Sequence, residues 1–384
     1  MVDMTTLIGA AEASRTLGVT KPTLYAYVSR GLLSRRAAID GRTSLYDRTE
    51  IETLAARSRR RTPVERPSID VQIATAITHL DDDSPSYRGR RVLDLVGSCR
   101  FEEVADLLLV GDLAGDRSAW RVDRAALEHA RRVVAAAAPT DPITALALSS
   151  LSLGDRPEGD AAAVARALIT MAPSVLGGPL GGDVASRLAR AWVRRPTDEL
   201  TAAISCALVL LADHELATST LAVRVAASVR TTPAAAIATG LNVVAGPYHG
   251  AASSAAAAMF DEAAETGATQ TVEDRLRRGE RLPGFGHTVY RTGDPRFAPL
   301  LAAVRSIPAA GDRIERVDAV IAEAGRSVGA LPNVDLALGA LYHVADLPRD
   351  VPVFAVARIA GWGAHYAEES NERAVRFRGL AAPR

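Results

Sequence analysis

The segment LPGFGHTVYRTGDPRF, residues 282–297, is the most informative stretch of the chain. It lies between helical patterns at 270–279 and 296–306, and it combines three glycines with four polar side chains: His287, Arg291, Asp294 and Arg296. Glycine lets the backbone turn sharply and lets another group approach the chain closely. Side chains can converge on a ligand from such a loop, so the segment predicts a binding or catalytic site.

Three other segments have a polar residue inside an otherwise apolar helical pattern. His214 lies in ADHELATSTLAVRVAAS, His249 follows a Gly-Pro turn and opens an alanine-rich helix in NVVAGPYHGAASSAAAAMF, and Asp335 begins a helix in PNVDLALGALYHV. Singly, each has an ordinary structural explanation: a core histidine, a turn or a helix cap. Together with the glycine-rich loop, they indicate one site built at junctions between loops and helices.

The expected positions of the histidines indicate a type of chemistry. A residue that opens a helix, as expected for His249 and His287, lies in the positive field of the helix N-terminus, which keeps an imidazole neutral. A neutral histidine can donate a hydrogen bond to a carbonyl oxygen that is becoming an enolate, while a nearby carboxylate removes the proton alpha to that carbonyl. The pattern therefore favours formation of a carbon nucleophile from a thioester or a ketone.

Two other kinds of site are disfavoured by the same residues. A zinc site built from His214, His249 and His287 lacks any local ligand spacing, no closely spaced cysteine pair is present, and the nearby arginines would repel a cation. A serine hydrolase would need a G-x-S-x-G turn between a strand and a helix, which the sequence lacks. We therefore expect neither a metal nor a serine nucleophile.

The composition predicts a helical body. Of 384 residues, 48% are hydrophobic and only 4% are aromatic, while alanine, the strongest helix former, is abundant. No alternating pattern predicts a strand of any length, and the expected helices are 101–111, 123–137, 160–171, 182–192, 197–212, 231–245, 250–264, 270–279, 296–306, 311–328, 333–344 and 352–369.

Location and redox state are also predicted. The sequence has no secretory signal and no apolar run of the roughly 18 residues that a membrane helix needs, which predicts a cytoplasmic protein. Cys99 and Cys206 are too few for a disulfide framework and are expected to be buried, reduced thiols.

The first 62 residues form a predicted domain of their own. They carry one Lys and ten Arg against six acidic residues, a net charge of +5 in a chain whose total is zero. A helix that ends near Gly18, a second helix from Thr20 to Gly31 and a basic loop predict a helix-turn-helix with a wing. A basic, proline-containing linker at 57–68 separates this domain from the rest.

Residues 7–57 resemble the MerR-like winged helix-turn-helix family at these positions: Ala10, Ala13, Leu17, Gly18, Val19, Thr23, Leu24, Tyr27, Gly31, Leu32, Leu33 and Tyr46. In that family the second helix enters the major groove and the wing contacts phosphates. The resemblance implies DNA contacts by Lys21, Thr23, Tyr25, Arg30, Arg35, Arg36 and Arg42. The alternative is a helical module used for packing or dimer contacts, with solvated arginines.

From about residue 72 to 384, the chain resembles the citrate synthase family. The resemblance rests on GFGHTVYRTGDPR, GPYHG and NVD, and on an opening segment with YRG before a helix. It implies an all-α, two-lobed fold. The full expectation is a helix-turn-helix domain at 1–62 and a citrate synthase domain at 63–384, with a large lobe at about 68–245 and 345–384 and a small lobe at about 246–344.

The resemblance also implies roles for individual residues. Asp335 resembles the base that removes a methyl proton from acetyl-CoA, His249 the residue that hydrogen-bonds the thioester oxygen, and His287 the residue that polarises the oxaloacetate carbonyl. The expected oxaloacetate contacts are His214, Arg296, Arg358 and the tail residue Arg376. Coenzyme A would bind along the backbone of Leu282, Pro283, Gly284, Phe285 and Gly286.

The family places an arginine of the tail in the partner subunit's site, which implies a homodimer. Arg376 fits this role, although Phe377 stands where the family usually has proline, so Arg373 and Arg378 remain alternatives. Tyr248 and Ala251 are milder departures around GPYHG. Because proton transfer and electrostatics suffice for the reaction, the resemblance implies no metal or redox cofactor.

The expected function is a citrate synthase of the Si type, which condenses acetyl-CoA with oxaloacetate. One alternative is a 2-methylcitrate synthase that uses propionyl-CoA, since one extra methylene in a pocket is worth only about 1–3 kcal/mol. Another is a DNA-binding regulator with a citrate synthase-like metabolite sensor. The basic N-terminal domain favours the regulator, whereas the intact set of His249, His287 and Asp335 favours the enzyme.

Overall fold

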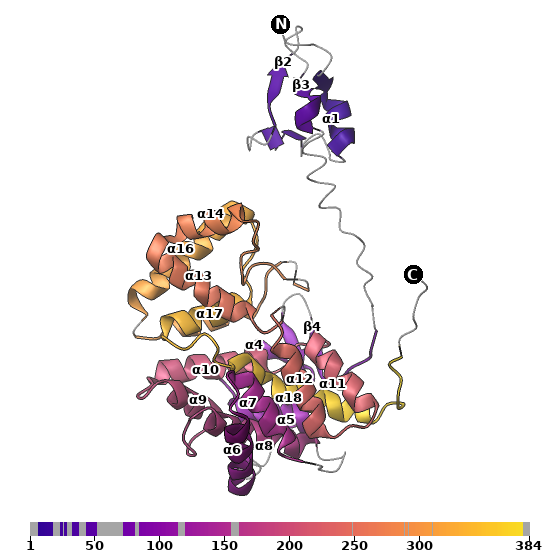
Figure 1. Ribbon diagram of the computed structural model, residues 1–384, viewed down its shortest axis with the longest axis vertical. Helices are drawn as coiled ribbons and strands as arrows, with labels where there is room; N and C mark the ends of the chain where they lie inside the picture. Colours follow the sequence, from indigo (N-terminus) through magenta and orange to yellow (C-terminus); the bar gives the residue numbers. More distant parts are fainter. Residues whose placement is uncertain are drawn as a thin grey trace. The chain divides into compact units, whose positions relative to one another are not determined.

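The computed structural model divides the chain into two compact units, Met1–Ile73 and Ala74–Arg384 (Figure 1). The expected boundary at 62/63 and the expected linker at 57–68 lie outside the described residues. The structure describes residues 7–17, 24–25, 27–28, 33–37, 44–51, 72–80, 84–113, 120–154, 161–247, 249–287, 289–290, 292–308 and 310–378.

Among its described residues, the N-terminal unit has helix α1 (Ala10–Leu17), further helical residues at 24–25, 27–28 and 48–51, and a small antiparallel sheet. Helix α1 follows strand β1 (Leu7–Gly9), and the sheet has the order β1-β3-β2, with β2 at Arg35–Ala37 and β3 at Ser44–Asp47. Its core consists of Ile8, Ala13, Leu17, Leu24, Leu33, Tyr46 and Ile51. The β2–β3 hairpin occupies the position at which the sequence predicts a wing.

The second unit is mostly helical, and the helical expectation is confirmed for it. The structure has α5 (Phe101–Val110), α6 (Arg124–Ala137), α8 (Ala161–Val175), α9 (Val184–Trp192), α10 (Asp198–Leu211), α12 (Pro233–Val244), α13 (Ala252–Thr266), α14 (Ala268–Arg277), α15 (Phe297–Arg305), α16 (Gly311–Val328), α17 (Val334–Val344) and α18 (Val353–Ser370). In the described part of the chain, no helix is both long enough and apolar enough to cross a membrane.

Two long helices were not expected from the sequence. Helix α7 (Pro142–Leu151) begins at an Asp141 cap with proline in its first turn, and it packs against α6, α8 and α12. Helix α11 (Thr218–Ser228) packs against α12 and α18. Threonine and valine lower the intrinsic helix propensity of α11, so tertiary packing rather than local preference determines its structure.

The expectation of no strands in the helical body is wrong in one place. Strands β4 (Thr78–Leu80), β5 (Pro85–Tyr87) and β6 (Arg90–Arg91) form an antiparallel sheet that leads into the short helix α4 (Val92–Leu95). Strands of two or three residues are too short to show an alternating pattern. The sheet buries Tyr87, whose hydroxyl reaches the turn after α10.

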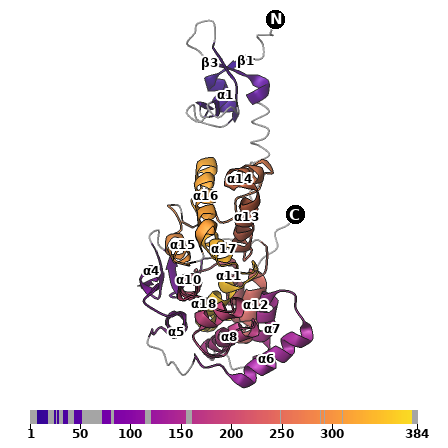
Figure 2. The ribbon, with the colours of Figure 1, turned by 90° about the vertical axis from the view of Figure 1, so that its left-hand side faces the viewer.

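Helices α13, α14, α16 and α17 form a group of their own within the second unit (Figures 1 and 2). Helix α13 packs along α17, and α14 packs along α16. The larger group surrounds α18, which contacts α5, α8, α10, α11 and α12 and is buried over most of its length. Residues 245–251 join α12 to α13 and residues 345–352 join α17 to α18, while α15 packs against both α17 and α10. The candidate site is lined by residues of both groups.

Candidate active site

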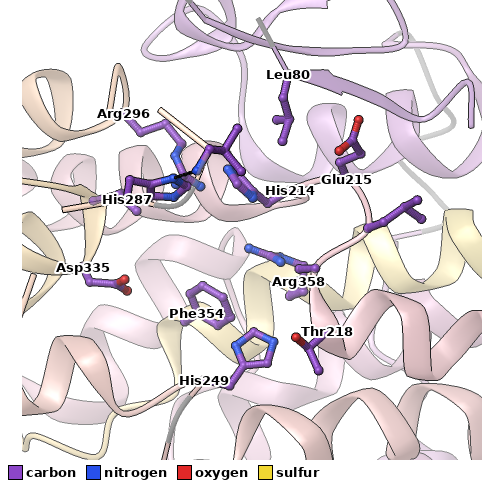
Figure 3. A pocket seen from close by; sticks show the side chains of 14 residues that line it. Leu80, His214, Glu215, Thr218, His249, His287, Arg296, Asp335, Phe354 and Arg358 are labelled. Carbon is purple, nitrogen blue, oxygen red and sulfur yellow. Dashed lines mark hydrogen bonds between the residues drawn. The ribbon is translucent and has the colours of Figure 1, made fainter. Parts of the chain in front are cut away.

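One cavity of about 410 Å³ collects side chains from segments far apart in the sequence (Figure 3). His214 and His287 lie along one side of it, His249, Phe354 and Arg358 lie along the other, and Asp335 lies at one end. The complete lining is Leu80, His214, Glu215, Leu216, Ala217, Thr218, His249, His287, Val289, Arg296, Val334, Asp335, Phe354 and Arg358. Six of the seven residues expected to be catalytic or to bind oxaloacetate therefore share one cavity.

The tautomer of His287 is determined by its own loop. Its Nδ1 accepts hydrogen bonds from the amides of Val289 at 3.0 Å and Tyr290 at 3.2 Å, so the proton of the neutral ring is on Nε2. The pKa of His287 is lowered by burial and by the positive charge of Arg296. The expectation that His287 opens a helix is wrong, because the next helix begins only at Phe297. The ring is neutral for a different reason.

His249 has the opposite tautomer. Its Nε2 accepts from the Ser219 amide at 3.3 Å and lies 2.9 Å from the Ser219 hydroxyl, so Nδ1 carries the proton. Burial, followed by the charge of Arg358, lowers the pKa of His249. His249 does not open a helix either: it lies in a turn, and α13 begins at Ala252. Both histidines are thus neutral donors, one through Nδ1 and the other through Nε2.

Asp335 lies in the first turn of α17. Its amide donates to the Oδ1 of Asn333, the residue that caps the helix, at 3.0 Å. Burial raises the pKa of Asp335 to about 6, although the charges of Arg296 and Arg358 oppose the shift. A carboxylate with a raised pKa that is still ionised at neutral pH is suited to be a general base.

Arg296 is held by a neighbour that the sequence reading assigned no role. The carboxylate of Asp294 accepts from both Nε and Nη2 of Arg296, each at 2.9 Å. It also accepts from the amide of Val334 at 2.9 Å. Burial alone would raise the pKa of Asp294, but the Arg296 guanidinium lowers it overall. Asp294 thereby joins the glycine-rich loop to the start of α17, next to Asp335.

Arg358 differs from Arg296 because, among the described residues, no carboxylate forms an ion pair with it, although the charge of Asp213 acts on it through space. It is 1% exposed, its Nε donates to the Leu211 carbonyl at 3.0 Å, and its Nη1 has no hydrogen-bond partner among the described residues. The guanidinium lies 4.5 Å from the centre of the Phe354 ring. A buried cation without a partner is costly, so this position indicates a place for an anion.

His214 lies in the turn between α10 and α11. Its ring meets the rings of His287 at 5.4 Å and Tyr290 at 5.7 Å, and its Nε2 is buried with no hydrogen-bond partner among the described residues. Burial, followed by Arg296, Arg358 and His287, holds the pKa of His214 well below its usual range. The neutral ring leaves one nitrogen available to a ligand in the cavity.

The segment 282–286 packs against the start of α17. A Cβ at Gly284, where φ is +78°, would lie 2.6 Å from the Cβ of Leu336, so this glycine permits the approach of the helix. The carbonyl of Gly284 accepts from the Asn333 amide at 2.9 Å, and that of Gly286 accepts from the Asn333 side chain at 2.7 Å. Space is open beside Gly286, which lines a second cavity of about 330 Å³.

Other expected residues lie elsewhere or outside the described residues. Arg376 does not line the cavity; its guanidinium binds the Glu369 carboxylate at 2.7 and 2.6 Å. Of the expected thiols, Cys206 is buried, whereas Cys99 is partly exposed. In the N-terminal unit, Tyr25 and Arg35 are exposed, and Arg36 pairs with Leu45 in the sheet. Lys21, Thr23, Arg30 and Arg42 lie outside the described residues.

Several lining residues were missed by sequence reasoning. Phe354 contacts both Arg358 and His249, whose ring centre is 6.0 Å away. Glu215 adopts a positive φ of +51°, an uncommon backbone conformation for a residue other than glycine. Leu80 comes from the unexpected sheet. Apolar and acidic residues in these contexts carry no local signal of a site, and only the tertiary structure brings them together.

Comparison with known proteins shows which sequences this chain is similar to. Residues 70–378 match the family described as "Citrate synthase, C-terminal domain". A 2-methylcitrate synthase from Mycobacterium tuberculosis is 30% identical, over 81% of this chain and 89% of the relative. A citrate synthase from Synechocystis is 31% identical, over 76% of this chain and 84% of the relative.

A solved structure extends the similarity to the fold. The ternary complex of Thermoplasma acidophilum citrate synthase with carboxymethyl coenzyme A and oxaloacetate matches with a TM-score of 0.68 at 26% identity, over 82% of this chain and 95% of the other. The fold and the relatives define an acyltransferase of the condensing class. The chain belongs to the citrate synthase family.

Proposed function

We propose that this protein condenses acetyl-CoA with oxaloacetate and water to give citrate and CoA. The observation that carries the proposal is the convergence, in one cavity, of a carboxylate with a raised pKa and two neutral histidines whose donor nitrogens are fixed by their surroundings. A condensation needs this set: a base for one substrate and a hydrogen-bond donor for each of two carbonyl oxygens.

The proposed reaction begins at Asp335. Its carboxylate removes a methyl proton from acetyl-CoA, while the Nδ1–H of His249 donates to the thioester oxygen and stabilises the enol. The new carbon nucleophile attacks the ketone of oxaloacetate, whose oxygen receives a hydrogen bond from the Nε2–H of His287. Water then cleaves the thioester of citryl-CoA, which releases citrate and CoA. Arg296, Arg358 and His214 hold the oxaloacetate carboxylates.

The test is the release of free CoA thiol from acetyl-CoA with and without oxaloacetate. We expect release that requires oxaloacetate. Tight binding of oxaloacetate without thiol release would instead support the alternative of a metabolite-sensing regulator, which needs the binding groups but not the base. A protein that shows neither oxaloacetate binding nor thiol release would contradict both the enzyme and the regulator hypotheses. The ratio of kcat/KM for acetyl-CoA and propionyl-CoA, measured in the same assay, distinguishes a citrate synthase from a 2-methylcitrate synthase.

We further propose that the active form is a homodimer in which Arg376 enters the partner's cavity. Apolar side chains are exposed at Leu151 of α7, Val225 of α11 and Val229 directly after α11, which are 51%, 41% and 58% exposed, and such side chains suit contact with a second copy of the chain. Truncation after Asn371 should abolish activity while the dimer persists in sedimentation. An active truncated enzyme would exclude a catalytic role for the tail.

A second activity, DNA binding, is proposed for the N-terminal unit. The supporting observations are the net charge of +5 over residues 1–62, the hairpin at the expected wing, and the exposed side chains of Tyr25 and Arg35. Two heads on a dimer suit a palindromic site with half-sites about one helical turn apart. We expect the full-length protein to slow the electrophoretic migration of duplex DNA at low salt. Its affinity for DNA should fall steeply as the salt concentration rises.

A matched pair of variants tests the DNA proposal. Arg30→Ala with Arg42→Ala should remove retardation without changing citrate formation, and deletion of residues 1–62 should do the same. Arg48→Ala is the control, because Arg48 is already paired with Glu12 at 2.8 Å and has less charge to offer a phosphate. Full-length protein that shows no salt-dependent binding, together with a deletion that destroys the dimer, would make the unit a structural element.

A further inference from the structure

A chain of buried polar side chains leads away from the turn that carries His214. Asp213, which directly precedes His214, is 0% exposed. Its Oδ2 accepts from the Glu215 amide at 2.9 Å and lies 3.3 Å from Nε2 of His365, a fully buried residue of α18. The carboxylate of Asp213 thus contacts both sides of the turn: the residue after His214 and the helix beneath it.

The backbone of the same turn is held independently. The Asp213 amide donates to the Tyr87 hydroxyl at 3.2 Å, and that hydroxyl can in turn donate to the Asp213 carbonyl at 3.2 Å. The next residue but one, Glu215, has a positive φ of +51°. An uncommon conformation of this kind persists only where its surroundings determine it. The side-chain bond of Asp213 to the Glu215 amide is one such determinant.

The other nitrogen of His365 faces a cation. Arg224 is 0% exposed, and its Nη1 lies 3.0 Å from Nδ1 of His365. A guanidinium can only donate, so Nδ1 must accept and the ring proton must lie on Nε2, directed at Asp213. His365 therefore accepts from a buried cation and donates to a buried anion at the same time. A hydrophobic side chain could fill this space but could do neither.

Arg224 extends the chain to the C-terminal tail. Its Nε donates to Glu369 at 2.9 Å, and Glu369 also binds Arg376. Glu368, a second partner of Arg224, accepts from the amide of Ala76 at 2.8 Å. Arg224 is therefore held by several partners. Because His365 contacts both Arg224 and Asp213, it links the position of Arg224 to the turn at the cavity.

We propose that His365 is a positioning residue for oxaloacetate: through Asp213, it holds the turn that presents His214 to the cavity. The inference rests on the proposed function, because it takes oxaloacetate as the ligand of His214. His365 touches no substrate, so its loss should weaken oxaloacetate binding and leave acetyl-CoA binding nearly unchanged.

The experiment compares His365→Leu with His365→Gln in the full-length protein. Oxaloacetate binding is measured by calorimetry in the absence of acetyl-CoA, and KM is measured for each substrate. We expect His365→Leu to weaken oxaloacetate binding at least about tenfold and to change KM for acetyl-CoA less than about twofold. Glutamine can accept from Arg224 through its oxygen and donate to Asp213 through its nitrogen, so it should restore most of the affinity.

A double-mutant cycle tests whether Asp213 is the link. If the leucine variant folds poorly, Asp213→Ala alone should still weaken oxaloacetate binding and leave KM for acetyl-CoA nearly unchanged. If His365 acts through Asp213, the effect of Asp213→Ala on oxaloacetate binding should be nearly the same in wild-type and His365→Gln backgrounds, whereas His365→Leu and Asp213→Ala should not add. Additive losses for His365→Leu and Asp213→Ala, equal losses for both substrates, or a glutamine variant no better than leucine would each overturn the proposal.

The fold supplies a matched control for a buried histidine of this type. His343 in α17 also bridges a carboxylate and an arginine, with Nδ1 at 2.6 Å from Asp261 and Nε2 at 3.3 Å from Arg316, but it does not line the cavity. His343→Gln should leave oxaloacetate affinity within about twofold of wild type. Wild-type protein that neither binds nor turns over oxaloacetate would defeat the proposed function itself, whereas normal wild-type activity with an unaffected His365→Leu variant would defeat only the positioning role.

Discussion

The two arginines of the cavity lie on different walls and differ in how their buried positive charges are compensated. On the wall formed by the glycine-rich loop and α17, Arg296 is neutralised by Asp294 through two hydrogen bonds. On the wall formed by α18, Arg358 has only a backbone carbonyl and the face of Phe354, and one of its nitrogens has no partner among the described residues. Arg296 is therefore held in place without a ligand, whereas Arg358 can satisfy all its hydrogen-bond donors only when an anion is bound.

This difference separates two tasks that one family motif does not distinguish. A paired arginine gains less from binding a carboxylate, but its position is fixed beforehand, so little ordering is lost on binding. An unpaired buried arginine destabilises the empty protein and gains the most when a carboxylate arrives.

The largest effect is expected for Asp335→Asn. The change removes the base but neither arginine, so kcat should fall roughly 10²–10⁴-fold while oxaloacetate binding and folding remain largely intact. Steady-state kinetics with calorimetry of oxaloacetate binding measure both quantities. Turnover close to that of wild type would show that Asp335 is not the base.

The comparison itself is tested by Arg358→Met and Arg296→Met. Each should weaken oxaloacetate binding far more than acetyl-CoA binding, by about 10²-fold if a charge-assisted contact is lost. Their stabilities should diverge. Arg358→Met removes a buried cation that has no hydrogen-bonded carboxylate among the described residues and only a through-space attraction to Asp213, so it should lower Tm less. Arg296→Met leaves Asp294 buried without its partner, a loss that typically costs about 3–5 kcal/mol.

Thermal unfolding of the two methionine variants, without ligand, measures whether their losses of stability differ. Equal losses of stability would show that Arg358 is as well compensated as Arg296. Equal losses of affinity for both substrates would show that neither arginine is specific to oxaloacetate.

A smaller effect is expected in the pH dependence of stability. Asp335 has a pKa of about 6 in the folded protein against an ordinary value of 3.8, so it contributes stability below pH 4 that is lost as pH rises through 6. Asp335→Asn lacks this loss. Relative to wild type, the free energy of unfolding of the variant should therefore increase between pH 4 and pH 7, by up to about 3 kcal/mol.

Denaturant unfolding at both pH values measures that gain. In wild type, kcat/KM should fall about tenfold per pH unit below pH 6, because the base becomes protonated. A stability difference between variant and wild type that does not change with pH would contradict the raised pKa.

The smallest effect is expected for Ser219→Ala. The hydroxyl of Ser219 lies 2.9 Å from Nε2 of His249, but the backbone amide of the same residue also donates to that nitrogen at 3.3 Å. The tautomer of His249 should survive, and kcat should fall only a few-fold. A loss near that of Asp335→Asn would mean that the hydroxyl, rather than the amide, orients the ring.

The sequence could predict which residues share the cavity better than the reasons for their properties. Glycine and polar residues in an apolar, alanine-rich chain identified the loop at 284–296, His249 and Asp335, because such interruptions are locally visible. The neutral state expected for His287 is present, but its cause is burial and Arg296, not a helix terminus. Which charge lies near which ring depends on tertiary contacts that no local pattern encodes.

The elements that were missed have a common physical reason. Helix α11 and the sheet β4–β6 owe their structure to packing against other segments, which outweighs weak local preferences. The pairing of Asp213 with His365 joins residues 152 positions apart. Asp294 was visible in the motif, but its bond to the Val334 amide, which ties the loop to α17, could not be inferred from its neighbours in the chain.

The contact between Gly284 and Leu336 has a consequence for engineering and for evolution. With no room for a Cβ between them, the glycine-rich loop and the first turn of α17 are one mechanical part, although 52 residues separate them in the chain. Substitution of Gly284 by any residue with a side chain is therefore disfavoured. A loop transplanted from a relative would have to be accompanied by that relative's first turn of α17. Gly286 differs: a Cβ there would meet nothing within 4 Å, but its φ of +80° is a conformation that side-chain-bearing residues rarely adopt, so its backbone rather than its surroundings favours glycine.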